Sequence, residues 1–429
     1  MAKIEPFCGV RYNSKKIGSL SKVVCPPYDV INKQQRLRYL RKSKYNAVNL
    51  VLPSGNTSKN AHKNAKRLID LWLKQDILSY DKQPCIYACR EEYKIDNVAK
   101  KRLGFIALLE IEADKDKTAL PHEKIFKKFK VERFNLMLTT QAHLSPIFTV
   151  FKDDAAKVED MLISVMRKQK PDVEFSADGV KKELWKISDV EIINKLQNIM
   201  QNEKIFIADG HHRFNACVAL RDHLSRRQKN TTCKMPYDYA MVYFLSMKDK
   251  GLAILPTHRA IKFLPANYSK DSMLKKLSRH FYVSMVNSKE DLIKKLETAD
   301  RQKRHAFGFF YDDSFVFALL KDENIIKNIG SADNSISWKK LDVSILHHFI
   351  LPQLLNIKEK VRGMRNIYYY RGKTEAIRVV KSDEFKMAIF LNPTRIKEVE
   401  KVATSGNNMP HKSTYFFPKP FTGVVFHKF

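Results

Sequence analysis

The sequence is poor in glycine and cysteine and has no long apolar run. Only 13 of 429 residues are Gly and only 6 are Cys, which excludes a collagen-like or disulfide-dense scaffold. The longest apolar runs, such as residues 240–245, are strand-sized and far shorter than the roughly 20 residues that cross a bilayer. Residues 1–7 lack the apolar core of a signal peptide. We therefore expect a cytoplasmic protein without a membrane partner.

Acidic residues are also scarce, with 46 Asp and Glu against 78 Lys and Arg, a net charge of +32. Such an excess can indicate a nucleic-acid partner. Here the lysines are spread along the whole chain, and there is no basic tail, zinc module or basic helix with heptads. The pattern favours a solvated surface, and a nucleic-acid partner is not expected, although the charge does not exclude one.

The hydrophobic pattern predicts an α/β protein with a mixed sheet and two packed lobes, because a single core rarely grows beyond about 250–300 residues. We place the N-terminal lobe at 1–235 and a C-terminal α/β lobe at 236–429. The pattern predicts strands at 44–53, 84–93, 102–111, 146–151, 204–208, 239–246, 252–259, 305–311, 314–320, 385–391 and 412–416. It predicts helices at 61–73, 131–138, 158–167, 189–200, 272–279 and 342–355, and one that begins at 211.

The segment Asp209-Gly210-His211-His212-Arg213 lies between a short apolar strand and a helical pattern. A helix N-terminus offers unpaired N–H groups and a positive dipole end, so it favours an oxyanion, and an arginine in the first turn adds a planar donor fork. Gly210 lets the backbone approach a ligand, while Asp209 can cap the helix or accept a proton. A helix built only for stability would place acids there. The turn therefore predicts phosphate binding.

Four other segments carry polar side chains beside expected strand ends or rigid turns. The double proline before Tyr28 and Asp29 holds both residues in place. His122 and Glu123 could form a general base or hold magnesium, or simply be a solvated turn. Basic and hydroxyl groups that suit an anion follow at Thr257, His258 and Arg259 and again at Lys412, Ser413 and Thr414. We expect Asp29, Glu123, Asp209, Arg213 and Arg259 to converge on one pocket.

These strings together resemble the family known as domain of unknown function 1015. The matching pieces are Arg11, residues 24–31, 120–123, 145–148, 207–213, 255–259 and 409–415. They follow the same order along nearly the whole chain. The sequence departs from the family pattern at Cys25, Phe214 and His411, where alanine, tyrosine and glutamine are expected.

The strand-Asp-Gly-His-x-Arg-helix turn is also similar to that of the superfamily of ParB proteins, sulfiredoxins and free-serine kinases. The resemblance implies a ParB/sulfiredoxin-like nucleotide site in which Asp209, His211 and Arg213 face a phosphate, with Gly210 and His212 beside it and Glu123 as a candidate base. It further implies ATP or ADP with magnesium as cofactor; the metal ligands stay unknown. The function expected is phosphotransfer to a small hydroxyl-bearing metabolite, with free serine as one candidate. The alternatives are a nucleotide-switched DNA-binding protein, a phosphate-ester hydrolase or a non-catalytic metabolite- or phosphate-binding protein.

Overall fold

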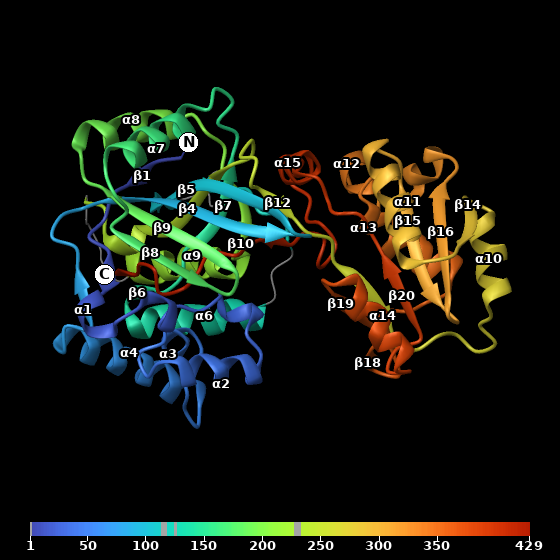
Figure 1. Cartoon of the computed structure of the whole chain (residues 1–429), viewed down its shortest axis with the longest axis horizontal. Helices are drawn as coiled ribbons and strands as arrows, with labels where there is room; N and C mark the ends of the chain where they lie inside the picture. The colour runs from blue at the N-terminus through green and yellow to red at the C-terminus, as the bar shows by residue number, and fades with distance from the viewer. Residues whose placement is uncertain (1, 113–117, 124–126, 227–232) are drawn as a thin grey trace. The chain divides into compact units, whose positions relative to one another are not determined.

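The computed structural model describes residues 2–112, 118–123, 127–226 and 233–429 and divides the chain into two compact units (Figure 1). The first unit comprises Met1–Pro121, Ile125–Ala253 and Pro418–Phe429, and the second His122–Lys124 and Ile254–Phe417. The predicted boundary at residue 235 falls before strand β11 (Tyr239–Ser246), whereas the structure divides the chain after it. The reason is that β11 forms backbone ladders with β5 and β7 of the first unit.

The first unit contains an eight-stranded mixed sheet in the order β10-β7-β11-β5-β4-β9-β8, with β1 pairing β5. The pair β7 and β11 is parallel, and the other described pairs of this sheet are antiparallel. The strands are β1 (Ile4–Glu5), β4 (Ile86–Ile95), β5 (Val98–Glu110), β7 (Ile147–Phe151), β8 (Val173–Ala177), β9 (Val180–Ile187) and β10 (Phe206–Asp209). The short strands β2 (Val10–Tyr12), β3 (Leu78–Tyr80), β6 (Ala142–His143) and β22 (His427–Lys428) form two further pairs.

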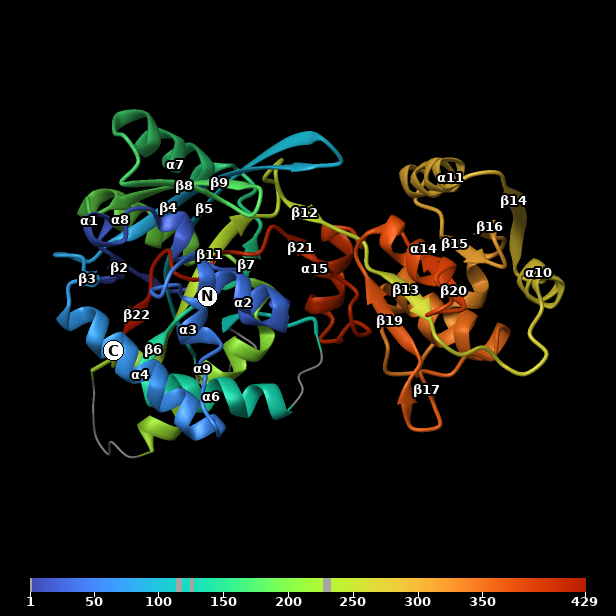
Figure 2. The ribbon, with the colours of Figure 1, turned by 60° about the horizontal axis from the view of Figure 1, so that its bottom comes forward.

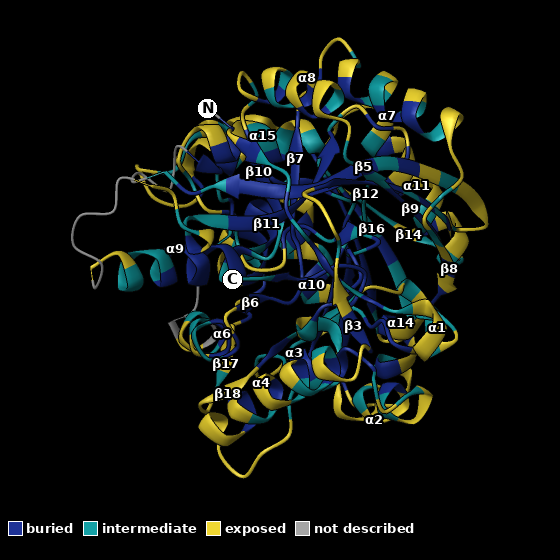
Figure 3. Ribbon diagram, turned by 90° about the vertical axis from the view of Figure 1, so that its left-hand side faces the viewer, coloured by how far each residue is buried: buried dark blue, intermediate teal, exposed yellow. Residues whose placement is uncertain are grey.

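Helices surround this sheet, and the figures show α7 and α8 on one side of it and α2, α3, α4 and α6 on the other (Figures 1 and 2). The helices are α1 (Ser14–Ile17), α2 (Lys33–Lys42), α3 (Val48–Val51), α4 (Ser58–Lys74), α6 (Lys127–Thr140), α7 (Lys157–Lys168), α8 (Val190–Met200) and α9 (His211–Ser225). Figure 3 shows β7 and β11 almost wholly buried, while the outer faces of α7 and α8 are exposed. The buried side chains of α7 and α8 share one hydrophobic core with the sheet, whereas α4 packs against α3 and α6.

The second unit contains a six-stranded antiparallel sheet in the order β14-β16-β15-β20-β13-β19. Its strands are β13 (His258–Ile261), β14 (Phe281–Val286), β15 (Ala306–Tyr311), β16 (Ser314–Leu320), β19 (Ile367–Tyr370) and β20 (Met387–Phe390). Its helices are α10 (Lys270–Ser278), α11 (Lys289–Arg301), α12 (Ile336–Lys339), α13 (Asp342–Ile345), the π-helix η5 (Leu346–Leu354), α14 (Lys373–Lys381) and α15 (Ile396–Thr404). Leucines of α11 pack with Ala376 and Ile377 of α14 in its core. Among the described residues of the chain, no helix is both long and apolar enough to cross a membrane.

Most of the long periodic elements are confirmed, but three short predictions are wrong. The strand predicted at 44–53 is helical at α3, where Asn46 accepts a hydrogen bond from the Val48 N–H at 3.0 Å and also donates to the Val24 carbonyl. Tyr28 and Asp29, expected at the end of a strand, lie in the 3₁₀ turn η2 (Tyr28–Val30). The strand predicted at 412–416 is reduced to β21 (Phe416–Phe417), because Lys412 adopts a positive φ of 58°. Local capping and turn geometry override the apolar pattern at these places.

Candidate functional site

The turn between β10 and α9 has the strand-to-helix geometry that the sequence predicts. The pairing register of β10 with β7 shifts between Ile207 and Asp209, and such an irregularity re-aims the side chain that follows it. Gly210 is the N-cap of α9 with a φ of 93°, a backbone conformation that suits glycine, and it provides no side-chain cap. A Cβ at Gly210 would meet the Arg213 guanidinium at 2.9 Å. Only glycine therefore fits between this turn and Arg213.

Asp209 is bound by two cations rather than capping the helix. Its Oδ2 accepts a hydrogen bond from Arg213 Nη2 at 2.8 Å, and its Oδ1 lies 2.5 Å from Lys419 Nζ. The Arg213 side chain is buried and also donates to the Pro146 carbonyl at 2.6 Å. The negative charge of Asp209 is thus fixed in front of the α9 N-terminus, and its two oxygens face different cations.

Lys419 joins Asp209 to Asp29. Its ammonium contacts both carboxylates, and its side chain is only 9% exposed. Burial opposes the charged form, but Asp209 and Asp29 outweigh burial and raise the pKa of Lys419 above its ordinary value. Asp29 is therefore brought to the β10–α9 turn through Lys419, a lysine that sequence reasoning did not single out.

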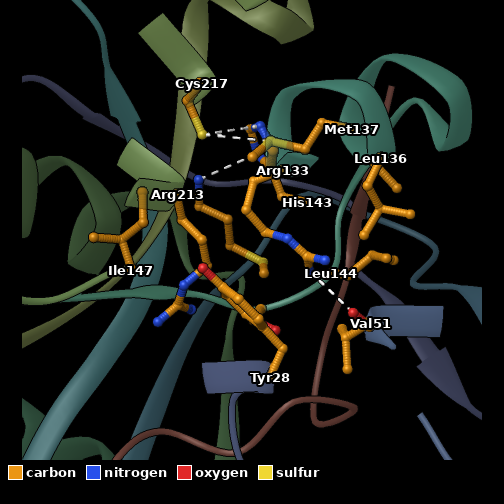
Figure 4. A pocket seen from close by; sticks show the side chains of 13 residues that line it. Tyr28, Val51, Arg133, Leu136, Met137, His143, Leu144, Ile147, Arg213 and Cys217 are labelled. Carbon is orange, nitrogen blue, oxygen red and sulfur yellow. Dashed lines mark hydrogen bonds between the residues drawn. The ribbon is translucent and has the colours of Figure 1, made fainter. Parts of the chain in front are cut away.

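Tyr28 packs between two arginines beside this cluster (Figure 4). The Arg133 guanidinium lies 4.0 Å from the centre of the Tyr28 ring, within the range of a cation–π contact. Burial raises the pKa of Tyr28, although Arg133 and Arg213 act in the opposite direction. Tyr28 therefore remains a neutral phenol that can donate a hydrogen bond.

The two histidines of the turn differ in their surroundings. His211 is buried, and burial together with His212, Lys419 and Arg213 lowers its pKa to about 3. His211 is therefore neutral at physiological pH and suits a hydrogen-bonding role better than a charged one. His212 is half-buried.

A narrow cavity of about 30 Å³ lies next to Arg213, Tyr28 and Arg133, which is room for a water molecule or two. Figure 4 shows Cys217, His143 and Met137 at one end of it, with Cys217 Sγ 3.6 Å from His143 Nε2. Burial raises the pKa of Cys217 to about 12, so this sulfur is a thiol and not a nucleophilic thiolate. A metabolite would enter this cavity only if the lining side chains moved.

The remaining predicted residues form a second set, within the second unit. His122 Nε2 lies 3.1 Å from Thr414 Oγ1, and Glu123 forms an isolated β-bridge with Met409. Arg259 Nη2 donates to the Lys412 carbonyl at 3.2 Å. The three motifs 120–123, 255–259 and 409–415, which are far apart in the sequence, thus lie side by side.

Within this second set, the alternation of strand β13 separates His258 from Arg259. Thr257 and Arg259 share one side, and the Thr257 carbonyl accepts from the Arg259 guanidinium. His258 lies against Phe390 at 5.3 Å between ring centroids, and its Nδ1 accepts from the Leu391 N–H at 3.4 Å. Ser413 donates to the Pro410 carbonyl at 2.6 Å and so shapes the turn of its own segment.

The structure groups the predicted residues without joining the groups. Tyr28, Asp29, Asp209 and Arg213 gather around Lys419 in the first unit, while Glu123 and Arg259 belong to the second. The predicted convergence of all these residues on one pocket stays a prediction. Among the described residues, no group of three or more His, Cys, Asp or Glu side chains is arranged to hold a metal ion.

Comparison with known proteins places the chain in a family. Residues 4–344 match the family model described as Protein of unknown function (DUF1015). Because this match covers most of the chain, the protein belongs to that family. No curated protein matches the chain.

Several solved structures are similar to the chain at low identity. Free serine kinase in complex with AMP is 14% identical with a TM-score of 0.34, over 75% of this chain and 91% of that one. A conserved hypothetical protein from Pyrococcus furiosus is 16% identical with a TM-score of 0.33, over 75% and 93%. SbnI from Staphylococcus aureus, with a C-terminal truncation, is 11% identical with a TM-score of 0.35, over 75% and 86%.

Proposed function

We propose that the protein is a nucleotide-dependent phosphotransferase that acts on a small hydroxyl-bearing metabolite, with free serine as the first acceptor to test. The observation that carries the proposal is the position of Asp209, fixed between Arg213 and Lys419 at the N-terminus of α9. Phosphoryl transfer requires mainly positioning and neutralisation of charge. The N-terminal N–H groups of a 15-residue helix and two cations serve both needs.

The phosphate-binding role falls to Gly210, His212, Arg213 and Lys419. Without a ligand, Arg213 is paired with Asp209, and Lys419 is paired with both Asp209 and Asp29. A guanidinium can contact a phosphate and a carboxylate together because its N–H groups point in several directions. Arg213 therefore need not leave Asp209 to bind the ligand.

The reaction would move one phosphoryl group and one proton. The acceptor oxygen forms a bond to the terminal phosphorus of ATP or ADP as the bond to the leaving phosphate oxygen breaks, which releases ADP or AMP. The hydroxyl proton passes to a carboxylate, for which Asp209 in the first unit and Glu123 in the second are the candidates. His211, neutral and buried beside the turn, would orient the phosphate by hydrogen bonding.

Magnesium, if it takes part, would be held by the carboxylates of Asp29 and Asp209. Asp29 and Asp209 both contact one ammonium, so carboxylate oxygens of two chain segments already face a single cation. Magnesium sites on nucleotides typically use one or two carboxylates plus the phosphates. Asp29 and Asp209 are the residues that would hold the ion, which when bound would neutralise phosphate charge.

The test combines ligand binding with turnover. Purified protein with magnesium and ATP or ADP should show a raised melting temperature, and with L-serine it should form phosphoserine that mass spectrometry detects. Arg213→Ala should weaken nucleotide binding about 10- to 150-fold, since contacts to charged groups contribute about 1.5–3 kcal/mol. Arg226→Ala, at the exposed other end of α9, is the matched control and should bind like wild type.

Asp209→Asn separates binding from turnover. The substitution keeps the shape and removes the charge, so nucleotide binding should persist while product formation stops. If Arg213→Ala folds, as judged by circular dichroism, and shifts with nucleotides as wild type does, the proposal is wrong. Phosphate release from ATP without any phosphorylated acceptor would indicate that the protein is a hydrolase and not a transferase.

A further inference from the structure

We propose that the second unit contains a binding site for a carboxylate ligand, in which the buried guanidinium of Arg259 is the anchor. Arg259 lies on β13 and is 0% exposed. Among the described residues, no Asp or Glu lies within ion-pair distance of it; its polar contacts are Thr257, His347 and Lys412. A buried arginine beside neutral groups is the central observation.

Two other buried cations, both in the first unit, have a carboxylate partner. Arg102 is 0% exposed and lies 2.5 Å from Glu91 Oε2, and Lys182 Nζ lies 3.1 Å from Glu91 Oε1. Buried charges in proteins are generally paired, because an unpaired buried charge loses its hydration without recovering it elsewhere. Arg259 departs from this pattern, which indicates that its counter-charge comes from a ligand.

The groups around Arg259 solvate the guanidinium without neutralising it. Arg259 Nε donates to His347 Nε2 at 3.2 Å, so this nitrogen is a lone-pair acceptor. Burial, followed by the charge of Arg259, lowers the pKa of His347 well below its ordinary value. The Tyr369 ring lies 5.3 Å from the guanidinium carbon, which adds a cation–π contact. Burial lowers the pKa of Arg259 itself to about 10.

Other charged groups at the site face Tyr369 or His347. The guanidinium carbon of Arg365 lies 5.4 Å from the centre of the Tyr369 ring. His411 packs edge-on against the same ring at 5.5 Å, and the charge of Glu359 acts on Tyr369 and on His348. Among the described residues, Arg259 and Arg365 act on Tyr369 together with Glu359, so positive charge is in excess there, and the charge of Glu359 also reaches His348.

The charge count selects the class of ligand. One carboxylate cancels one guanidinium, and the two match as parallel N–H···O bonds. A phosphate dianion would leave negative charge in the same buried space, which is unfavourable without a second buried cation. The N–H groups of the guanidinium also outnumber the acceptors that contact it. The sequence predicted a phosphate contact at Arg259, and the structure favours a monoanion.

A ligand would reach Arg259 from the side of the turn at 409–412. His411 and Lys412 are exposed, and the Lys412 carbonyl is the acceptor that lies on the guanidinium at 3.2 Å. A carboxylate oxygen is a stronger acceptor than this carbonyl and would replace it. The turn at 409–412 would move, while Ser413 would stay in place because Thr394 donates a hydrogen bond to its carbonyl at 2.8 Å.

The inference goes beyond the phosphotransfer proposal, since it requires neither a nucleotide nor turnover. The test uses the full chain without nucleotide and measures its melting temperature as a function of the glycolate concentration. Glycolamide, a neutral molecule of nearly the same shape, is measured in the same way. Chloride keeps the ionic strength constant in both series. Glycolate should raise the melting temperature of wild type, and glycolamide should leave it unchanged. Arg259→Met should weaken the glycolate response at least about 10-fold.

Arg365→Met is the matched control, because it removes an exposed arginine that contacts the same Tyr369 ring, and it should keep the glycolate response. Arg259→Lys keeps the charge without the fork and should also weaken binding, which preserves the test if Arg259→Met does not fold. Equal glycolate binding by wild type and Arg259→Met would overturn the site, and stabilisation by inorganic phosphate alone would overturn the ligand class. The measurement contains neither nucleotide nor acceptor, so failure of the phosphotransfer proposal would not affect this result.

Discussion

Arg213 in the first unit and Arg259 in the second are both buried arginines placed near strand ends, yet their electrostatic settings are opposite. Arg213 shares Asp209 with Lys419, which in turn contacts Asp29, so two cations meet two carboxylates. Arg259 is surrounded by a neutral histidine, an aromatic ring and backbone carbonyls. A cluster whose charges cancel is stable without a ligand. An uncancelled buried charge is stabilised by a ligand that carries the opposite charge.

The difference also separates what substitutions reveal. In the cluster of Asp29, Lys419, Asp209 and Arg213, removal of one member leaves a partner without part of its counter-charge, so stability is expected to change along with ligand binding or turnover. At Arg259 the removal of charge leaves no orphaned carboxylate, so loss of ligand binding should not be accompanied by unfolding. The predictions below begin with a buried cluster in which each cation has a carboxylate partner and end with Arg259, which has none among the described residues.

The largest effect is expected at Glu91, which pairs with both Arg102 and Lys182. Glu91→Gln should lower the free energy of unfolding by about 3–5 kcal/mol, because two buried cations lose their partner. Urea unfolding followed by the fluorescence of Trp72 and Trp185, both in the first unit, measures this change. Glu92→Gln, whose pair with Lys101 is largely exposed, is the control and should change stability by less than about 1 kcal/mol.

Lys419→Met should destabilise the first unit by about 2 kcal/mol at neutral pH, since Asp29 and Asp209 would then lack their shared cation, with the partial exposure of Asp29 limiting the loss. The pKa of Lys419 is raised, so its contribution is fully present below the ordinary lysine value and is lost only as pH rises through the raised value. The difference from wild type should therefore be the same in mildly acidic and neutral buffer, and urea unfolding in both measures it. Equal stability of Lys419→Met and wild type at neutral pH would contradict the assigned role of Lys419.

The next effect is a pH dependence that arises from His211. Its folded pKa of about 3 lies below the ordinary value of 6.5, so the unfolded state binds the proton first. The contribution of His211 to stability is therefore complete above pH 6.5 and is lost as pH falls toward 3, with a slope of at most about 1.4 kcal/mol per pH unit. His211→Asn should flatten the stability profile of the first unit in this range, and an unchanged profile would exclude a neutral buried His211.

The smallest effect on stability is expected at the unbalanced arginine. Arg259→Met should either raise the free energy of unfolding or lower it by less than about 1 kcal/mol, because the substitution removes a buried charge that lacks a carboxylate partner. Trp338 lies in the second unit and reports on it. A loss of more than about 2 kcal/mol would show that the protein itself satisfies Arg259, and the contrast with Arg213 would then disappear.

The sequence predicted the long elements well because their apolar spacing reflects burial. The pattern of β11 at 239–246 and of α8 near 189–200 matches the structure closely. It failed at α3, where the backbone conformation depends on hydrogen bonds from Asn46 to the segment that contains Val24. Alternation of apolar residues over so few positions does not distinguish a strand from a buried helical turn.

The candidate site was predictable where one segment held the whole signal. Asp209, Gly210 and Arg213 are close in the sequence, and the contacts among them form within this one turn. Lys419 lies 390 residues from Asp29, and nothing in a lysine-rich sequence sets this lysine apart. Arg259 was noticed, but the absence of a carboxylate beside it is a property of three-dimensional packing that no local pattern expresses.

The residues Pro418–Phe429 return to the first unit after the chain has built the second. There β22 pairs with β6, Phe426 exchanges hydrogen bonds with Val10, and Lys419 reaches Asp29 and Asp209. The second unit is thus an insertion within the first. During synthesis on the ribosome, the second unit has its whole sequence available while the first still waits for these residues. Assembly of the Asp29–Lys419–Asp209 cluster is therefore among the latest events in the maturation of the nascent chain.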